Sequence, residues 1–226
     1  MAGNYNVTFQ WNGLTGPKPL DTAPGEPAAT PQLQSYDLFP TRIWQAPLPG
    51  LARQLAHWVD AALAMRAASP RTAGRTNRQG WNSEHLAVLD LPAFVPLRDV
   101  VRAACASALG EMGVRGMRLR LQSWINMHDR GGFNFLHVHE GSLLSGSFYL
   151  QVPPGSGKFV FRDPRPGVIH GYVKGAVPNG YSDIHLTPAA GLLVLFPCWM
   201  EHFVEPHEND QPRIAIAFNA LEDTTG

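Results

Sequence analysis

The stretch NFLHVHEGS, residues 134–142, combines the alternation of a half-buried strand with two histidines one residue apart. Side chains at positions i and i+2 of a strand point to the same face, so His137 and His139 lean to the same side. Two such imidazoles are either a polar ladder on the surface or two ligands of a metal site. The rest of the sequence has to decide between these interpretations.

The segment that contains this stretch, from Gly116 onward, consists of β-rich runs separated by Gly and Pro, with no helical period between them. About eight strands in about 100 residues indicate a sandwich or a jelly-roll barrel. The fold class expected is therefore α+β and mainly β. The predicted strands lie at 117–127, 145–152, 157–161, 167–173, 182–188, 191–197, 201–205 and 213–220.

The residues before the jelly roll divide into a lead and a helical part. Residues 1–35 are rich in Pro, Gly, Thr and Ala, which favours an extended or poorly ordered lead. Apolar residues at helical spacing predict helices over Leu51–Ala68 and about Pro96–Met112, both packed on the sheet. We thus expect a single domain over 36–226, with its helical part at about 48–113 and its jelly roll at about 116–221.

Two further segments are expected to be loops. Residues 71–90 have a loop-like composition, and Asn77, Trp81 and Asn82 would either overhang a site or belong to a plain surface connection. The Gly-rich insert from Pro164 to Tyr181 is long enough for a lid, or is a simple surface excursion.

Composition narrows the class of partner. The 18 basic and 18 acidic residues balance, which argues against a nucleic-acid surface or an anionic membrane. Two cysteines are too few for a disulfide framework, and neither a signal peptide nor a membrane span is predicted. We expect a cytoplasmic protein with a small-molecule partner. An exposed edge strand leaves a homodimer open.

Two later residues add to the histidine pair. His202 lies near a strand end, where a ligand can be aimed inward. Arg213 interrupts an apolar strand, and the residues on its side, Ala215 and Ala217, are small. An inward guanidinium needs an anion or several acceptors, and its fork geometry suits a carboxylate. A structural ion pair with Asp163 or Glu201 is the alternative.

Taken together, these residues resemble the iron(II)- and 2-oxoglutarate-dependent dioxygenases, whose fold is a double-stranded β-helix, a cupin-like jelly roll. The resemblance covers roughly residues 117–220. It is closest to bacterial and phage proteins described only as 2-oxoglutarate/iron(II) oxygenases, which share Asn-x-x-His-x-His and the Ser-Gly strand that follows. The segments that carry it are NMHDRGGFNFLHVH (126–139), GKFVFRDPR (157–165), FPCWMEHFV (196–204) and RIAIAFN (213–219).

The resemblance implies an enzyme and assigns roles to its residues. His137, His139 and His202 would bind iron(II), and Arg213 would pair with the far carboxylate of 2-oxoglutarate. O₂ would then be used to hydroxylate an unknown substrate, with release of succinate and CO₂. Asn126 lies where many relatives place a Tyr that also contacts the cosubstrate. Further candidates for the pocket are Ser145 and Tyr149, which share a face by strand parity, together with Asn134 and Trp124.

The sequence departs from the family pattern at two positions. The usual second ligand is Asp or Glu, whereas His139 stands here, so the site is either a three-histidine site or one in which Glu140 supplies the carboxylate. Strand parity favours His139. Relatives often carry Ser where this chain has Ala215.

Two other classes of protein stay open from the sequence. One is a cupin-type three-histidine metalloenzyme that does not use 2-oxoglutarate. The other is a jelly-roll binding protein without catalysis, which would have a wide shallow groove.

Overall fold

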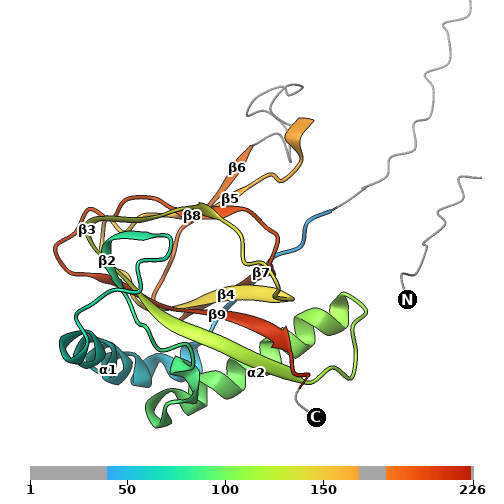
Figure 1. Ribbon diagram of the computed structural model, residues 1–226, viewed down its shortest axis with the longest axis horizontal. Coiled ribbons are helices and arrows are strands. Elements are labelled where there is room, and N and C mark those ends of the chain that lie inside the picture. The colour runs from blue at the N-terminus through green and yellow to red at the C-terminus, as the bar shows by residue number, and fades with distance from the viewer. Residues whose placement is uncertain (1–39, 168–181, 225–226) are drawn as a thin grey trace, which may run out of the picture. The chain divides into compact units, whose positions relative to one another are not determined.

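The computed structural model describes residues 40–167 and 182–224, and its compact unit begins at Thr41. In this part of the chain nine strands form one antiparallel sheet in the order β1-β7-β4-β9-β3-β8-β5-β6, with β2 paired to β3 (Figure 1). The strands are β1 (Trp44–Pro47), β2 (Asn77–Asn82), β3 (Leu119–His137), β4 (Leu144–Gln151), β5 (Phe159–Arg162), β6 (Asp183–Leu186), β7 (Leu192–Pro197), β8 (His202–Val204) and β9 (Arg213–Glu222).

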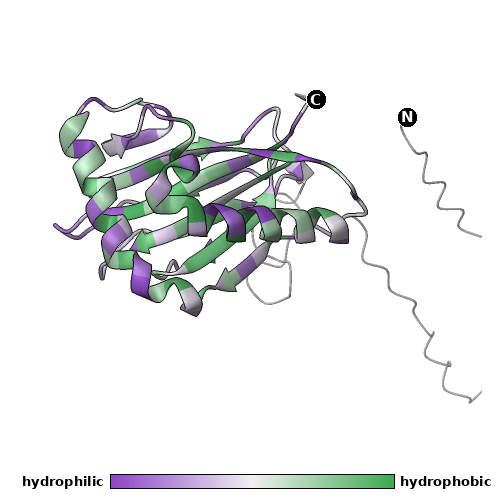
Figure 2. Cartoon of the chain, turned by 90° about the horizontal axis from the view of Figure 1, so that it is seen from below, coloured by the Kyte–Doolittle hydropathy of each residue, from purple (hydrophilic) through white to green (hydrophobic). Residues whose placement is uncertain are grey.

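Two helices, α1 (Leu55–Ala68) and α2 (Val95–Glu111), cover one face of the sheet below β4, β9 and β3 (Figure 1). Short 3-10 turns precede them at Pro49–Gln54, Val88–Asp90 and Pro92–Phe94. Trp58 of α1 contacts Phe148 of β4 edge to face, with ring centroids 5.9 Å apart. In Figure 2, seen from the helix side, hydrophobic residues run along the strands behind the helices. The predicted helices are confirmed to within a few residues, apart from the 3-10 start of the first.

Alternation along β9 explains why the sheet has two different faces. Ile214, Ile216 and Phe218 belong to the core under the helices, and the residues between them face the inside of the curled sheet. A second apolar cluster fills part of that inside. It consists of Tyr149, Phe159, Phe161, Val194, Phe196, Met200, Val204 and Ala215. The histidine-bearing strand ends lie beside this inner cluster, and the predicted mainly β fold is confirmed.

The expectation that residues 71–90 form a loop is wrong for its middle part. Residues 77–82 are strand β2, which pairs antiparallel with β3 so that Asn77 lies opposite Asn134 and Asn82 opposite Asn126. The polar sequence NRQGWN lacks the apolar alternation that predicts a strand. Backbone hydrogen bonds to β3, formed across about 50 residues of chain, therefore override the local composition.

Two glycines lie within β3 before His137 without ending the strand. β3 continues through Gly131 and Gly132 and changes its partner from β9 to β8. Gly131 has a φ of 80°, and a Cβ at Gly132 would run into the backbone oxygen of Gln79. Glycines at these two positions thus allow the strand to bend sharply without ending.

Other expectations fall outside the described residues. These are the lead at 1–35, most of the predicted strand 167–173 and the part of the lid segment from 168 to 181. Strand β1, which was not predicted, pairs with β7 at the edge of the sheet. Among the described residues, no helix has both the length and the apolar character needed to cross a membrane.

Candidate functional site

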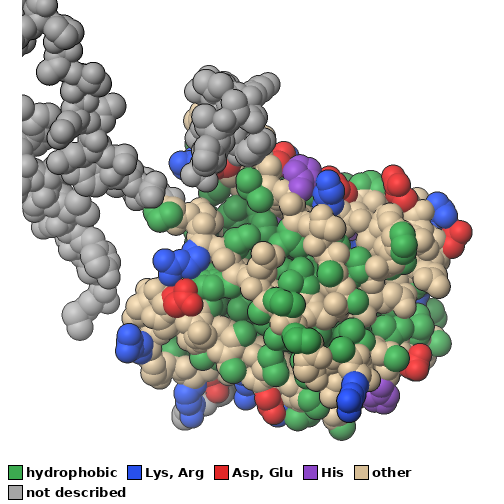
Figure 3. All heavy atoms as spheres, turned by 180° about the vertical axis from the view of Figure 1, so that it is seen from behind, with side chains coloured by type: hydrophobic (Ala, Val, Ile, Leu, Met, Phe, Trp, Pro, Cys, Tyr) green, Lys and Arg blue, Asp and Glu red, His purple; other side chains and the backbone are tan. Residues whose placement is uncertain are grey.

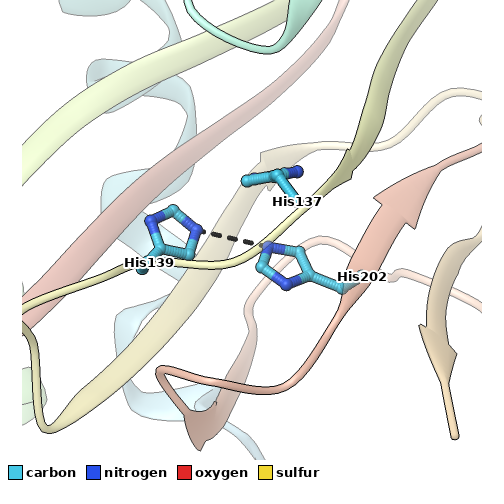
Figure 4. Close-up of side chains that lie close together, drawn as sticks. All are labelled: His137, His139 and His202. Atoms are coloured by element: carbon cyan, nitrogen blue, oxygen red, sulfur yellow. Dashed lines mark hydrogen bonds between the residues drawn. The ribbon is translucent and has the colours of Figure 1, made fainter. Parts of the chain in front are cut away.

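Three histidines from two paired strands converge inside the sheet. His137 ends β3 and lies opposite His202, the first residue of β8, while His139 follows two residues after His137. One ring nitrogen of each lies within 4.8 Å of those of the other two. Figure 4 shows the three rings facing a common centre. His137 and His139 both reach this centre because residues two positions apart in an extended segment point to the same face.

Backbone carbonyls orient two of the rings. Nδ1 of His137 lies 2.6 Å from the carbonyl oxygen of Phe135, and Nδ1 of His202 lies 2.8 Å from that of Met200. A carbonyl can only accept, so both Nδ1 atoms donate and both Nε2 atoms keep their lone pairs. Nε2 of His139 lies 3.2 Å from Nε2 of His202 and donates to it. His137 and His202 are thus in the tautomer that presents Nε2 to a metal ion, whereas His139 binds one through Nε2 only when its proton moves to Nδ1.

The cluster holds its histidines neutral. Burial lowers the pKa of His139 to about 3, and it lowers the pKa of His137 and of His202 as well. Mutual repulsion of the cations that protonation would create adds to the effect for His139 and His202. Neutral imidazole is the form that binds a metal ion, so the site is ready for a cation at neutral pH.

Aromatic rings fix the positions of the histidines. His202 packs against Phe196 and Phe159, with ring centroids 4.6 Å and 5.1 Å away. His139 packs on Trp124 at 5.8 Å. Such packing restricts the imidazoles to one orientation and excludes water from one side of the centre.

A cavity of about 270 Å³ opens beside the three histidines. In the described part of the chain, Arg75 is the one wall residue with a permanent charge, and no acidic residue lines the wall. Most of the other wall residues are amides, hydroxyls or apolar groups. They are Thr76, Asn82, Leu86, Gln122, Trp124, Asn126, Asn134, Val138, Gly146, Ser147, Phe196, Val204, Ala217 and Asn219.

The predicted pocket residues take different positions. Trp124, Asn126 and Asn134 line the cavity. Ser145 and Tyr149 are buried on the same face as expected from parity, but neither forms part of the cavity wall. Ser145 instead donates a hydrogen bond to Asn219 at 2.8 Å. The alternative ligand, Glu140, is exposed and lies outside the histidine cluster.

Arg213 is buried on the inner face, with 2% of its surface exposed, and it does not reach the cavity wall. Its guanidinium lies 5.0 Å from the ring centre of Tyr149, and its Nη1 donates to Nδ1 of His128 at 3.1 Å. None of the ion pairs in the described part of the chain involves Arg213, and Asp163 pairs with Arg165 instead. Desolvation lowers the pKa of the guanidinium, which nevertheless stays charged.

An amide network beside the cavity was missed from the sequence. The Oδ1 atom of Asn126 accepts hydrogen bonds from Asn77 at 2.9 Å and Asn82 at 3.2 Å, and its Nδ2 atom donates to Asn134 at 3.1 Å. Asn134 in turn donates to Thr76 at 2.8 Å. The network depends on the pairing of β2 with β3. Its four asparagines, two in NRQGWN and two in the strand opposite, would therefore have been a sequence signal only once that pairing was known.

Arg75 was also missed. Its guanidinium lies 5.2 Å from the ring centre of Trp124, and its one hydrogen bond, to the backbone oxygen of Ser83, is long at 3.4 Å. An arginine in a loop-like polar segment carries no pattern that would single it out.

Residues 122–219 match a family model described as "Putative 2OG-Fe(II) oxygenase". The matched segment runs from β3 to β9 and includes the histidine cluster and Arg213. No curated protein matches the chain.

Solved structures share the fold at low sequence identity. A prolyl-4-hydroxylase of Pseudomonas putida is 17% identical, with 81% of this chain and 94% of that chain covered and a TM-score of 0.59. The carbocyclase SnoK from nogalamycin biosynthesis is 17% identical, with 80% of each chain covered and a TM-score of 0.57. HygX from Streptomyces hygroscopicus, with nickel and 2-oxoglutarate bound, is 12% identical, with 81% and 84% covered and a TM-score of 0.54. These likenesses confirm the jelly-roll fold.

The family model therefore covers the strands that bring the three histidines together, on a fold that the solved structures share. Residues 122–219 are thus similar to the iron(II)- and 2-oxoglutarate-dependent oxygenases, and the similarity includes the histidine cluster.

Proposed function

We propose that His137, His139 and His202 bind the iron(II) of this oxygenase, and that Arg213 anchors the far carboxylate of 2-oxoglutarate. The observation that carries the proposal is the convergence of three neutral imidazoles, each with a ring nitrogen within 4.8 Å of the others, on a cavity to whose wall the described residues contribute no acidic group. With both cosubstrates, the iron supplies the oxidant that hydroxylates a C–H bond, with release of succinate and CO₂.

The donor set fits iron(II). Imidazole is a common ligand of iron, and three ligands from two adjacent strands leave the opposite side open for a chelating oxoacid and O₂. The hydrogen bonds from Nδ1 of His137 and His202 to backbone carbonyls are the outer-shell contacts that orient metal-binding histidines.

His139, and not Glu140, is proposed as the third ligand. Glu140 is exposed, whereas His139 packs between Trp124 and His202 with Nε2 toward the centre. The site then holds one negative charge fewer than a site with two histidines and a carboxylate.

The role proposed for Arg213 is supported by its unpaired charge. Its Nε atom and the hydroxyl of Tyr149 are buried, and neither has a hydrogen-bond partner in the described part of the chain. A buried cation without a counter-ion is costly, and a carboxylate from the cosubstrate would relieve that cost with bidentate geometry. Because Tyr149 lies over the guanidinium and Arg213 is outside the cavity wall, binding requires the Tyr149 side chain to move.

Asn126 is proposed to contact the cosubstrate between the two ends. It lies opposite Ala215 in the β3–β9 register, two residues from the His128–Arg213 pair on the same face. Two residues along a strand span about 6.6 Å, so Asn126 stands between the cavity and the anchor. The amide network holds its side chain in place.

The prime substrate is proposed to be a small molecule, and nucleic acid is disfavoured as a partner. On the face drawn in Figure 3, acidic and basic side chains are interspersed around the rim and the centre carries uncharged groups, so no basic stripe for phosphates is visible there. The two cysteines are unpaired, in accord with the proposed cytoplasmic location. Pairing of two copies through an edge strand is retained as a proposal.

The test is anaerobic titration of the iron(II)-loaded protein with 2-oxoglutarate, recorded through the visible charge-transfer band of a chelated oxoacid. We expect a saturable band that is lost in His137→Ala. Metal binding without the band would favour the cupin-type alternative, and absence of metal binding would leave the histidines as scaffold.

A further inference from the structure

We propose that His128 is a positioning residue of the cosubstrate site: it orients the guanidinium of Arg213 and leaves the charge of Arg213 free for the ligand carboxylate. This inference rests on the role proposed above for Arg213. The spacing of His128 along the sequence points to no partner.

The strand register places the two side chains together. His128 of β3 lies directly opposite Arg213 of β9, and both point to the inside of the curled sheet. His128 is completely buried and Arg213 is 2% exposed. The distance from Nη1 of Arg213 to Nδ1 of His128 is 3.1 Å, which is a normal hydrogen bond.

The chemistry of the pair fixes the state of the imidazole. A guanidinium has donors but no acceptor, so Nδ1 of His128 must accept and the proton of the ring resides on Nε2. Burial, and then the neighbouring charge of Arg213, lower the pKa of His128 well below its usual value, which keeps the ring neutral. The pair thus carries a single positive charge.

An anion site with a single arginine needs a neutral hydrogen-bond acceptor to orient the guanidinium, because a charged acceptor would cancel its positive charge. A carboxylate in place of His128 would orient the guanidinium equally well, but it would neutralise the charge and compete with the ligand. His128 restricts the guanidinium without neutralising it. In the described part of the chain no residue forms a hydrogen bond with Nε of Arg213 that meets the distance and angle expected of one, and the ring of Tyr149 lies over the guanidinium.

A second histidine lies beside the pair. His207 is buried beside His128, where its Nε2 atom donates to the backbone oxygen of Gln211 at 2.7 Å. Nε2 of His128 and Nδ1 of His207 have no hydrogen-bond partner in the described part of the chain. Since no described acidic residue pairs with Arg213, the positive charge at the base of the sheet is available to an incoming carboxylate.

The experiment compares 2-oxoglutarate affinity and iron(II) affinity, measured separately, in His128→Leu and His128→Asn. Leucine removes the acceptor, and we expect the Kd for 2-oxoglutarate to rise about tenfold or more while the Kd for iron(II) stays unchanged, because a hydrogen bond to a charged group is lost. Asparagine places an oxygen near the position of Nδ1, so it should restore most of the affinity. Met127→Leu is the matched control, since Met127 is a buried neighbour on the opposite face of β3 and should leave both constants unchanged.

A double-variant cycle tests whether His128 acts through Arg213. In an Arg213→Met background, His128→Leu should produce no further loss of 2-oxoglutarate affinity. A wild-type affinity in His128→Leu, a further loss in the Arg213→Met background, or an equal loss of iron(II) affinity would each overturn the proposal. If the leucine variant does not fold, His128→Asn and His128→Gln are compared, because only the asparagine keeps an acceptor at the Nδ1 position; equal affinities would overturn it too. Failure of the proposed function would appear in the wild-type protein, as iron binding without a 2-oxoglutarate band.

Discussion

Replacing Arg213 with Met tests whether this residue anchors the ligand or has a structural role. Removal of one partner from a buried charge pair costs about 2–5 kcal/mol, which corresponds to a rise in Kd of roughly 30-fold to several-thousand-fold. We expect a loss of 2-oxoglutarate affinity in this range, because Arg213 is 2% exposed and solvent cannot screen its interaction with the carboxylate. Iron(II) affinity should be unchanged, since the histidine cluster does not include Arg213.

The same variant should have little effect on the stability of the ligand-free protein. Removing an unpaired buried cation is neutral or stabilising, by about 1–4 kcal/mol, while leaving Nδ1 of His128 without its donor costs about 1–3 kcal/mol. The two effects oppose each other, so we expect the free energy of unfolding to change by no more than about 3 kcal/mol in either direction. It is measured by urea unfolding of metal-free protein, and 2-oxoglutarate affinity by titration of the charge-transfer band.

Arg66→Met is the matched control for this experiment. Arg66 forms a bidentate pair with Asp129, with both distances at 2.7 Å, and lies outside the cavity wall. Its replacement should leave the Kd for 2-oxoglutarate unchanged. The reasoning would be refuted if Arg213→Met kept wild-type affinity for 2-oxoglutarate but lost several kcal/mol of stability, since Arg213 would then be structural.

Three further predictions follow from the site. Glu140→Ala should leave iron(II) affinity nearly unchanged, whereas His139→Ala should abolish or strongly weaken it in equilibrium metal binding; the reverse order would make Glu140 the ligand. Arg75→Gln should leave 2-oxoglutarate affinity unchanged, and a large loss by the band titration would transfer the anchor role from Arg213 to this cavity arginine. In metal-free protein, His139 is neutral when folded down to a pKa of about 3, while the unfolded chain takes up a proton below pH 6.5. Its contribution is therefore zero above pH 6.5 and destabilising below, by up to about 1.4 kcal/mol per pH unit between pH 6.5 and 3. His128, His137 and His202, whose pKa values are lowered as well, add to this fall. Urea unfolding should show the free energy of unfolding falling with pH over this range, less steeply in His139→Gln.

The parts of the site that depend on local periodicity could be predicted from the sequence. Strand parity placed His137 and His139 on one side, and the small residues beside Arg213 placed its side chain on the inner face, as the structure has them. The two helices follow from apolar spacing in the same way. These features need only the residues within one element.

The parts that depend on pairing between distant strands could not be predicted. The contact of His128 with Arg213 joins residues 85 positions apart and exists because of the β3–β9 register. The amide network likewise needs β2, a strand whose polar sequence carries no strand signal. Alternation also gives the face of a side chain but not its surroundings, so it could not show that Arg213 packs on Tyr149 and stays outside the cavity wall.

With His139 as the third ligand, the interior of the site carries an excess of positive charge. Iron(II) carries two positive charges and 2-oxoglutarate two negative ones, and a carboxylate ligand would normally balance the anchoring arginine. With His139 as the proposed third ligand, that ligand is neutral. No acidic residue of the described chain lines the cavity, and Arg75 adds a further positive charge at the wall. An aspartate or glutamate at position 128 would offset the positive charge of Arg213. This position holds a neutral imidazole instead. The absence of a carboxylate at both positions leaves the interior positive, which favours the entry of a dianion over that of a neutral or cationic ligand.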